Sequence, residues 1–349
     1  MRKYISLRVG KGMISFLVDK KALLITVLLT VLTIFLFLFS TGMGTMKISI
    51  GDVIDVILGK GEAMHALVIQ SFRLPRILAA ILVGMALAVA GAILQGIVRN
   101  PLASPDILGI TGGAAVAVVL FLTLFSDENN ALTVSIKWMP LAAFLGATII
   151  ALFIYILAWD NGGVSPLKLV LVGIGLYALT QAITTLLMIL GPIYRASQAN
   201  IWLTGTVYGT NWENVKILAP WTIILLVITF VSTRHLNIQE LGDDVATGVG
   251  SRVARQRLKL LLLSTGLTGG AVAFAGGIGF VGLLAPHIAR RIVGSAFGAL
   301  LPVSALIGAI LVMVSDLIGR TMFGAAEIPA GVFTAAIGAP YFIYLLFKK

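Results

Sequence analysis

The chain has 349 residues, of which 59% are hydrophobic and only 11% are charged, and its mean hydropathy is +1.05. Soluble domains carry about 25% charged residues, so this composition excludes a soluble protein and predicts an integral membrane protein. The absence of cysteine excludes disulfides, thiolate metal sites and cysteine nucleophiles. The net charge of +11 is better explained by basic residues flanking membrane spans than by nucleic-acid binding.

Ten segments are predicted to be spanning helices, since one crossing takes about 20 largely apolar residues. They cover residues 22–40, 77–98, 107–125, 139–159, 167–190, 217–233, 258–275, 277–294, 299–318 and 328–347. The eighth is short, follows the seventh after only Gly276, and carries Pro286. The prediction is an all-α, polytopic membrane protein with one transmembrane domain over residues 1–349.

Basic residues are distributed unevenly between the two sides of this topology. With the N-terminus inside, inside segments hold 17 of the 25 Lys and Arg residues and outside segments hold 8. This bias follows the positive-inside rule and predicts a multi-pass protein of the cell membrane with both termini cytoplasmic. The first apolar run, residues 22–39, exceeds the 7–15 residues or so of a signal-peptide core, so it is interpreted as an uncleaved span.

An internal repeat is suggested by a shift of 185 positions. The shift aligns Gly84, Ala86, Ala88, Ala90, Gly91, Ile93, Pro101 and Gly109 with Gly269, Ala271, Ala273, Ala275, Gly276, Ile278, Pro286 and Gly294. The second span runs inward and the seventh outward, which is the pattern of an inverted-topology repeat. Chance alignment of two spans rich in Ala and Gly is the alternative.

Glycines at short spacing favour close helix packing. Gly277, Gly279 and Gly282 match G-x-G-x-x-G, but they lie in apolar sequence with no preceding soluble strand, so a nucleotide fingerprint is rejected. No Walker A motif is present either, so any ATP that drives this protein must bind another chain. Gly84 and Gly91 at helical spacing predict a tight bundle.

Two inside loops carry structure beyond a simple connection. Residues 99–106 contain two prolines and are predicted to form a rigid hairpin. The longer loop, residues 234–259, contains Asn237 and Glu240 at capping-box spacing, followed by Asp243 or Asp244 as a cap for a second helix ending near Gly248. Two short helices here indicate either a docking surface for a cytosolic partner or a helix lying on the bilayer.

Three arginines fall on the outside against the general bias: Arg73 and Arg76 before the second span, and Arg320 after the ninth. Taken alone, they favour snorkelling or local pairing, for example of Arg320 with Asp316 at i,i+4.

The motifs together resemble the permease subunits of the iron(III)-siderophore, haem and cobalamin class of ATP-binding-cassette importers, the FecCD-type family. The matching stretches are RLPRILAAILVG, ALAVAGAILQGIVRNPLASPDILGITGGA, IWLTGT, LGDDVATGVG, AGGIGFVGLLAPHIARRIVG and AEIPAGVFTAAIGAPYFIYLL. They occur in family order from about Arg73 to the C-terminus. One departure is Thr206 in IWLTGT, where serine is more usual in the family.

The resemblance implies ten spanning helices and several partners. These are a second permease subunit, identical or paralogous, two cytosolic ATPase subunits below, and an extracytoplasmic substrate-binding protein above. It assigns ATPase coupling to Leu241, Gly242, Asp243, Asp244, Val245, Ala246, Gly248 and Gly250. It assigns Arg73, Arg76 and Arg320 to docking of the binding protein.

We therefore expect a transport permease, not an enzyme, that moves an iron(III)-siderophore complex through the lipid bilayer into the cytoplasm and needs no cofactor or metal of its own. Cobalamin or haem is the alternative cargo. A secondary transporter or channel is disfavoured because the spans carry almost no ionisable residues apart from Asp316. An intramembrane enzyme would need a nucleophile–base or metal-ligand set at helix spacing, and the sequence shows none.

Overall fold

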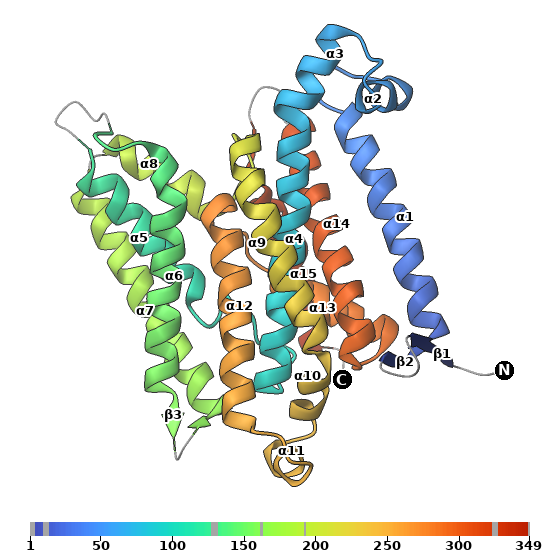
Figure 1. Cartoon of the computed structure of the whole chain (residues 1–349). Helices are drawn as coiled ribbons and strands as arrows, with labels where there is room; N and C mark the ends of the chain where they lie inside the picture. The colour runs from blue at the N-terminus through green and yellow to red at the C-terminus, as the bar shows by residue number, and fades with distance from the viewer. Residues whose placement is uncertain are drawn as a thin grey trace.

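The computed structural model describes residues 4–9, 14–126, 132–160, 163–191, 193–322 and 327–347. The helices are α1 Lys20–Gly42, α2 Ile50–Ile57, α3 Ala63–Leu67, η1 Val68–Arg73, α4 Leu74–Val98, α5 Ile110–Leu124, η2 Ile136–Trp138, α6 Met139–Leu157, α7 Pro166–Leu190, α8 Ile193–Thr204, α9 Trp212–Val231, α10 Thr233–Glu240, α11 Asp243–Gly248, α12 Val253–Ala275, α13 Val281–Val293, α14 Phe297–Thr321 and α15 Ala330–Phe347. The longer ones run side by side as a bundle (Figure 1).

Strands are a minor part of the described chain. They form two antiparallel hairpins: β1 Tyr4–Val9 with β2 Ile14–Asp19, and β3 Trp159–Asp160 with β4 Gly163–Val164. The prediction of a helical, polytopic membrane protein is therefore confirmed in its main feature. The extreme chain ends, residues 1–3 and 348–349, lie outside the described residues.

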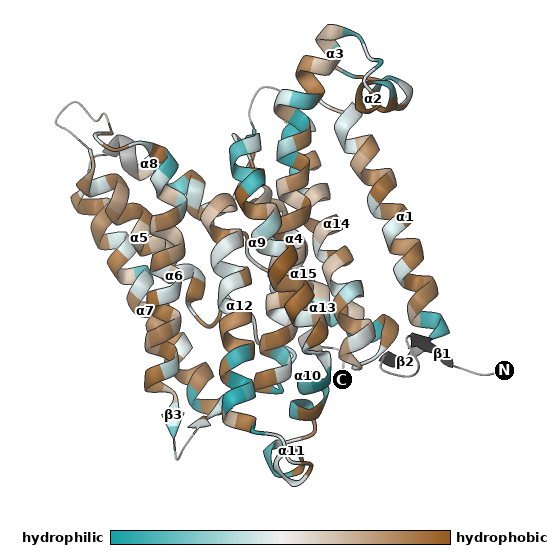
Figure 2. Cartoon of the chain, in the orientation of Figure 1, coloured by the Kyte–Doolittle hydropathy of each residue, from teal (hydrophilic) through white to brown (hydrophobic). Residues whose placement is uncertain are grey.

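Seven helices among the described residues are long and apolar enough to cross a membrane. They span Lys20–Gly42, Ala63–Val98, Ile136–Leu157, Pro166–Leu190, Trp212–Val231, Val253–Ala275 and Phe297–Thr321. Figure 2 shows hydrophobic residues along their middle parts and hydrophilic ones gathered at α10, α11 and the start of α12. Seven of the ten predicted spans thus correspond to full-length helices.

The other three predicted spans correspond to shorter helices. α5 and α15 are short apolar helices, and α13 has 13 residues, about 20 Å at 1.5 Å per residue. The prediction that the eighth span begins at residue 277 is wrong, because the backbone of Gly276 (φ 66°) and Phe280 (φ 66°) lies outside the helical region and α13 starts only at Val281.

Some elements carry no clear sequence signal. The segment from α2 to η1 lies beyond the end of α1, and α8 ends within IWLTGT, at Thr204. These helices have 5 to 12 residues, too few for the hydropathy of a membrane span to reveal them.

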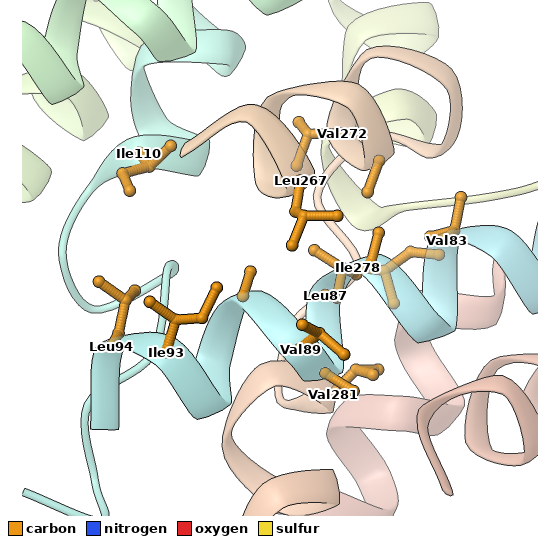
Figure 3. Packing of buried hydrophobic residues seen from close by; sticks show 14 of the residues in the cluster. Val83, Leu87, Val89, Ile93, Leu94, Ile110, Leu267, Val272, Ile278 and Val281 are labelled. Carbon is orange, nitrogen blue, oxygen red and sulfur yellow. The ribbon is translucent and has the colours of Figure 1, made fainter. Parts of the chain in front are cut away.

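α4 lies at the centre of the bundle and is its most enclosed long helix. Of the residues in its apolar stretch, 78% are buried, whereas the corresponding share for α1 is 6%. It packs mainly against α14, α12 and α13. Figure 3 shows Val83, Leu87 and Val89 of α4 packed beside Leu267 and Val272 of α12 and the 278–281 connection. The hydrophobic core is therefore centred on α4.

Glycine allows these neighbours to approach α4 closely. A Cβ at Gly84 would collide with the backbone oxygen of Gly308 on α14, and one at Gly91 with that of Gly282 on α13. The predicted close packing through small residues is confirmed.

The aligned halves of the suggested repeat do not share helix boundaries. α4 continues through Gly91 to Val98, whereas α12 ends at Ala275, just before the aligned Gly276. Pro101 lies in a loop and its aligned partner Pro286 lies inside α13. The inverted repeat stays a prediction.

We predict that Gly91→Ala destabilises the protein while Gly175→Ala does not. Both glycines lie inside long helices, and in that position the backbone preference of alanine stabilises a helix by about 0.5–1 kcal/mol relative to glycine. A Cβ at position 91 meets backbone, whereas one at position 175 meets open space. Overpacking of this kind costs about 1–3 kcal/mol. Thermal unfolding in detergent should show a lower midpoint for Gly91→Ala only; equal midpoints would contradict the close α4–α13 contact.

Candidate functional site

The loop between α9 and α12 folds into two short helices, α10 and α11, at one end of the bundle (Figure 1). The prediction of two helices, the second ending at Gly248, is confirmed. The predicted caps are wrong. α10 already starts at Thr233, and α11 begins after Gly242 without a side-chain cap. Asn237 lies inside α10, where its Oδ1 accepts a hydrogen bond from Phe297 N at 2.9 Å and so caps α14 instead.

An apolar stripe crosses the outer surface of this loop. Leu241, Val245 and Val249, which lie before, within and directly after α11, are 65%, 50% and 66% exposed. Gly242 (φ 110°) and Gly250 (φ 80°) flank α11 with backbone angles that favour glycine. Of the residues predicted to couple to an ATPase, Ala246 is fully buried and therefore supports the loop from within; Asp244 and Gly248 are exposed.

Asp243 holds the loop onto the bundle by charge. Its Oδ1 accepts from Arg257 Nη2 of α12 at 2.7 Å and also forms an ion pair with Arg99 at the end of α4. Arg99 Nε donates to the Gln239 carbonyl at 3.0 Å, and the buried Arg257 donates to the Val164 carbonyl at 2.6 Å. One carboxylate thus joins the loop to two long helices.

The electrostatics of Arg99 follow from this arrangement. Burial lowers the pKa of its guanidinium, the neighbouring Arg257 charge lowers it further, and Asp244 opposes the shift. Arginine stays charged in proteins regardless, so the ion pair persists at physiological pH. A second ion pair, Glu240 Oε1 with Arg290 Nη1 at 2.5 Å, fastens α10 to α13.

At the opposite end of the bundle, Arg73 and Arg320 cap α1. Arg73 donates to the carbonyls of Thr41 at 2.8 Å and Gly42 at 3.0 Å. Arg320 donates to the carbonyl of Met43 at 2.7 Å and to the carbonyl and hydroxyl of Ser40. A helix C-terminus leaves several carbonyls without intrahelical partners, and these two guanidinium groups supply the missing donors.

Arg76 completes the outer arginine cluster, defined as Arg73, Arg76 and Arg320. It pairs with the buried Asp316 at 2.8 Å and with Glu327 at 2.8 Å. Arg320 Nε lies 3.6 Å from Asp316 Oδ2, so the expected i,i+4 pair is present. The structure brings the three predicted docking arginines together and gives each of them intramolecular partners; their role in docking stays a prediction.

A cavity of about 430 Å³ lies between these two ends. Its lining comes from the α4–α5 connection, α5, α7, α8, the 277–280 connection, α13 and α15, and comprises Ser104, Asp106, Ile107, Thr111, Gly112, Ala115, Tyr177, Gln181, Trp202, Leu203, Gly277, Gly279, Phe280, Leu283 and Phe342. Aromatic and aliphatic surface predominates, with a few hydroxyl, amide and carboxylate groups. Such a wall suits a bulky, partly polar molecule.

Three of the sequence motifs meet beside this cavity through backbone contacts. Thr206 N donates to the Ala275 carbonyl at 2.8 Å, and Gly331 N donates to the Gly205 carbonyl at 2.9 Å. A Cβ at Gly276 or Gly331 would collide with the carbonyls of residues 202 or 204. The glycines in IWLTGT, AGGIGF and IPAGVF are therefore needed for the backbones to touch.

Asp106 connects the α4–α5 hairpin to the same region. Its Oδ2 accepts from Phe280 N at 3.3 Å, at the start of α13. The sequence suggested that an Asn or Asp of this hairpin caps the next helix, but α5 begins after Gly109 without a side-chain cap. Tyr177 and Gln181 were given no role, because single polar residues in an apolar helix do not reveal which way they face. Among the described residues, no cluster of His, Asp and Glu side chains is placed to hold a metal ion.

Comparison with known proteins decides the family. The profile of the FecCD transport family matches residues 32–348. The chain belongs to the FecCD transport family. This FecCD-family chain is 59% identical over 330 residues to the "Probable siderophore transport system permease protein YfhA" of Bacillus subtilis (strain 168), covering 95% of this chain and 96% of the relative. It is 45% identical to the achromobactin transport system permease protein CbrC of Dickeya dadantii (strain 3937), over 89% of this chain and 87% of that protein.

A solved structure supports the same assignment. An inward-facing metal-chelate type ABC transporter shares 31% sequence identity and a TM-score of 0.82 with this FecCD-family chain, covering 93% of it and 99% of the solved chain. The resemblance drawn from the sequence motifs is confirmed. The chain is an ABC-importer permease and not itself an enzyme.

We predict that Asp243→Asn loosens the α10–α11 loop of this FecCD-family chain, because the buried Arg257 loses the carboxylate that pairs with it. Leaving a buried hydrogen-bonding group unsatisfied costs about 1–3 kcal/mol, and more when the group is charged. Asp244→Asn is the matched control, since Asp244 is exposed on the same helix. Hydrogen exchange over residues 233–250 should accelerate in Asp243→Asn alone; the same protection in both variants would show that the ion pairs do not hold the loop.

Proposed function

We propose that this chain passes an iron(III)-siderophore complex across the cell membrane into the cytoplasm, using ATP hydrolysed by two cytosolic ATPase subunits and substrate delivered by an extracytoplasmic binding protein. The observation that carries this proposal is the near full-length identity of 59% to a protein named for siderophore transport. An iron(3+)-hydroxamate import permease of Bacillus subtilis, 42% identical over 94% of this chain, points to the same class of cargo.

In this proposal the central cavity is one wall of the passage. Its lining helices, α7 and α15 among them, present it at the surface of the chain, so a second permease subunit, identical or paralogous, would supply the facing wall. A few polar groups on an aromatic surface can accompany a large chelate without holding it tightly, which suits a passage better than a storage site.

The proposed topology has ten crossings with both termini cytoplasmic. α5, α13 and α15 complete it, and α13 is preceded by an irregular segment, residues 276–280, that is buried or half-buried, as membrane interiors require of non-helical backbone. In Figure 1, α1 begins and α15 ends toward the end of the bundle that carries α11, which is the expected cytoplasmic side.

The exposed stripe of Leu241, Val245 and Val249 would dock in a groove of the ATPase. Apolar side chains at a water-facing loop indicate a contact surface, because leaving them in water is unfavourable. Asp243 then connects a docked loop directly to α4 and α12. We infer that the loop, α4 and the cavity wall move as one body when the ATPase subunits close, giving alternating access.

At the other end, the outer arginine cluster would lie beneath the docked binding protein. Arg76 and Glu327 stand nearest to the surface there, with the Glu327 side chain 38% exposed. Carboxylates of the binding protein are the natural partners of arginine because the guanidinium can bind them in a bidentate manner.

Uptake of radioactive iron by cells tests the function. A strain lacking this chain should lose ATP-dependent accumulation of at least one ferric chelate among hydroxamate, citrate and catecholate probes, and the restored chain should recover it. Normal uptake of all of them together with loss of cobalamin or haem uptake would favour the alternative cargo. Uptake driven by an ion gradient instead of ATP would indicate a secondary transporter.

We predict that Leu241→Glu/Val245→Glu/Val249→Glu abolishes co-purification with the ATPase and transport while the chain still inserts. Three carboxylates cannot enter an apolar groove without unpaired burial. The control is Thr247→Glu, which places one charge on the other side of α11. Substitution of the buried Ala246 is avoided because it would disturb the loop itself. Normal ATPase binding by the triple variant would exclude this stripe as the contact.

We predict that docking of the binding protein to the unaltered chain weakens as salt rises, and that Arg73→Glu/Arg76→Glu/Arg320→Glu lowers the docking affinity more than Arg76→Ala does and removes this salt dependence. A hydrated pair contributes about 0.2–1 kcal/mol, so the single change should be mild. Truncating one member of a desolvated pair costs about 2–5 kcal/mol, and reversal adds repulsion. Docking affinity across a salt series is measured together with the thermal midpoint. A lower midpoint with unchanged affinity would mean that the cluster only holds helix ends.

A further inference from the structure

A second cavity, of about 220 Å³, lies between α6 and α12, with the start of α5 behind it. It is lined by Leu94, Leu108, Ile110, Thr148, Ala151, Leu152, Ile154, Tyr155, Leu169, Leu258, Leu261, Leu262 and Thr265. It shares no lining residue with the central cavity. The function proposed above therefore leaves it without a role.

The mouth of this cavity faces outward between two helices that are long enough to cross the membrane. Leu152 of α6 and Leu262 of α12 stand at the mouth, 56% and 61% exposed, whereas Ile154 and Leu169 deeper inside are buried. A water molecule occupies about 30 Å³, but an apolar cavity of this kind stays dry. An acyl chain from the surrounding bilayer matches both its size and its chemistry.

Basic residues stand near one end of the cavity. Arg255 and Lys259 are exposed on α12, and Lys259 lies beside Leu258 and one turn before Leu262. Neither takes part in an ion pair among the described residues, whereas the nearby Lys168 is paired with Asp160 at 3.0 Å. Trp159, 47% exposed and packed edge-on against Tyr155, is placed as an interfacial aromatic residue.

We propose that this cavity binds one anionic phospholipid from the leaflet on the side of the α10–α11 loop, which is named the coupling loop after the role proposed for it above. An acyl chain lies between α6 and α12, and the phosphate lies against Arg255 and Lys259. The two uncompensated cations explain why an anionic headgroup is selected over a zwitterionic one. The assignment rests on the proposed topology, in which α12 begins at the cytoplasmic side.

A lipid bound in this cavity would stabilise the position of the coupling loop. Arg257 lies between Arg255 and the lining residue Leu258, and it holds both Asp243 and the Val164 carbonyl. Leu169, at the floor of the cavity, follows β4 by five residues. Filling the cavity therefore stiffens the helix segment that carries the ion pairs of the loop.

Native mass spectrometry of the purified importer complex, titrated with phosphatidylglycerol or phosphatidylcholine, tests the site. We expect one phosphatidylglycerol to bind more tightly than phosphatidylcholine, and Arg255→Gln/Lys259→Gln to weaken it by about 30-fold while leaving phosphatidylcholine unchanged. Lys47→Gln/Lys60→Gln, which removes two exposed cations elsewhere, is the control and should change nothing.

Filling the mouth tests the acyl chain separately. Leu262→Trp, or Leu152→Trp from the opposite wall should one fail to fold, should displace both lipids, whereas Leu145→Trp on the lipid-facing side of α6 should not. The proposal would be overturned if the two lipids bind equally, or if phosphatidylglycerol still binds to both the double Gln variant and the Trp variants. The cavity would then be only a part of the surface in non-specific contact with lipid. The mass-spectrometric measurement of lipid binding does not require transport, so it tests this proposal even if the iron-uptake assay shows that the proposed function is wrong.

Discussion

The close backbone contact between α4 and its neighbours is the constraint on which the rest of the structure depends. Gly84 and Gly91 remove the side chains that would otherwise separate α4 from α14 and α13. Helices in a bilayer gain little from the hydrophobic effect against one another, so such close packing is the main source of their association. A dense core of this kind deforms little and transmits displacement.

α4 reaches both ends of the bundle. Arg76 in its first turn pairs with Asp316 of α14, and Arg99, directly after its last residue, pairs with Asp243 of the α10–α11 loop. Its 25 residues extend over about 37 Å. The α4–α5 hairpin then returns toward the central cavity, where Asp106 contacts the start of α13. One rigid helix therefore connects the outer arginines, the coupling loop and the cavity wall.

Composition and hydropathy were sufficient to predict a helical membrane protein and to place the long helices, because the bilayer demands about 20 apolar residues in a row. They could not predict that α13 starts at Val281, since Phe280 has a positive φ and its ring packs against Gly338 of α15, a contact far along the chain. The capping role of Asn237 toward α14 escaped prediction for a similar reason: its partner is 60 residues away. Outer arginines were visible in the sequence, but their use as caps for α1 appears only in three dimensions.

We propose that the coupling loop, α4 and the wall of the central cavity move as one body. Paired spin labels at Val249 and Ile107, both exposed and the second lining the cavity, measure it in the complete importer with and without ATP. We predict that the distance between the labels changes by less than about 2 Å, while the access of a water-soluble quencher to the label at position 107 changes with nucleotide. A large change in that distance with constant quencher access would show that the loop moves independently of the cavity, and would contradict the account.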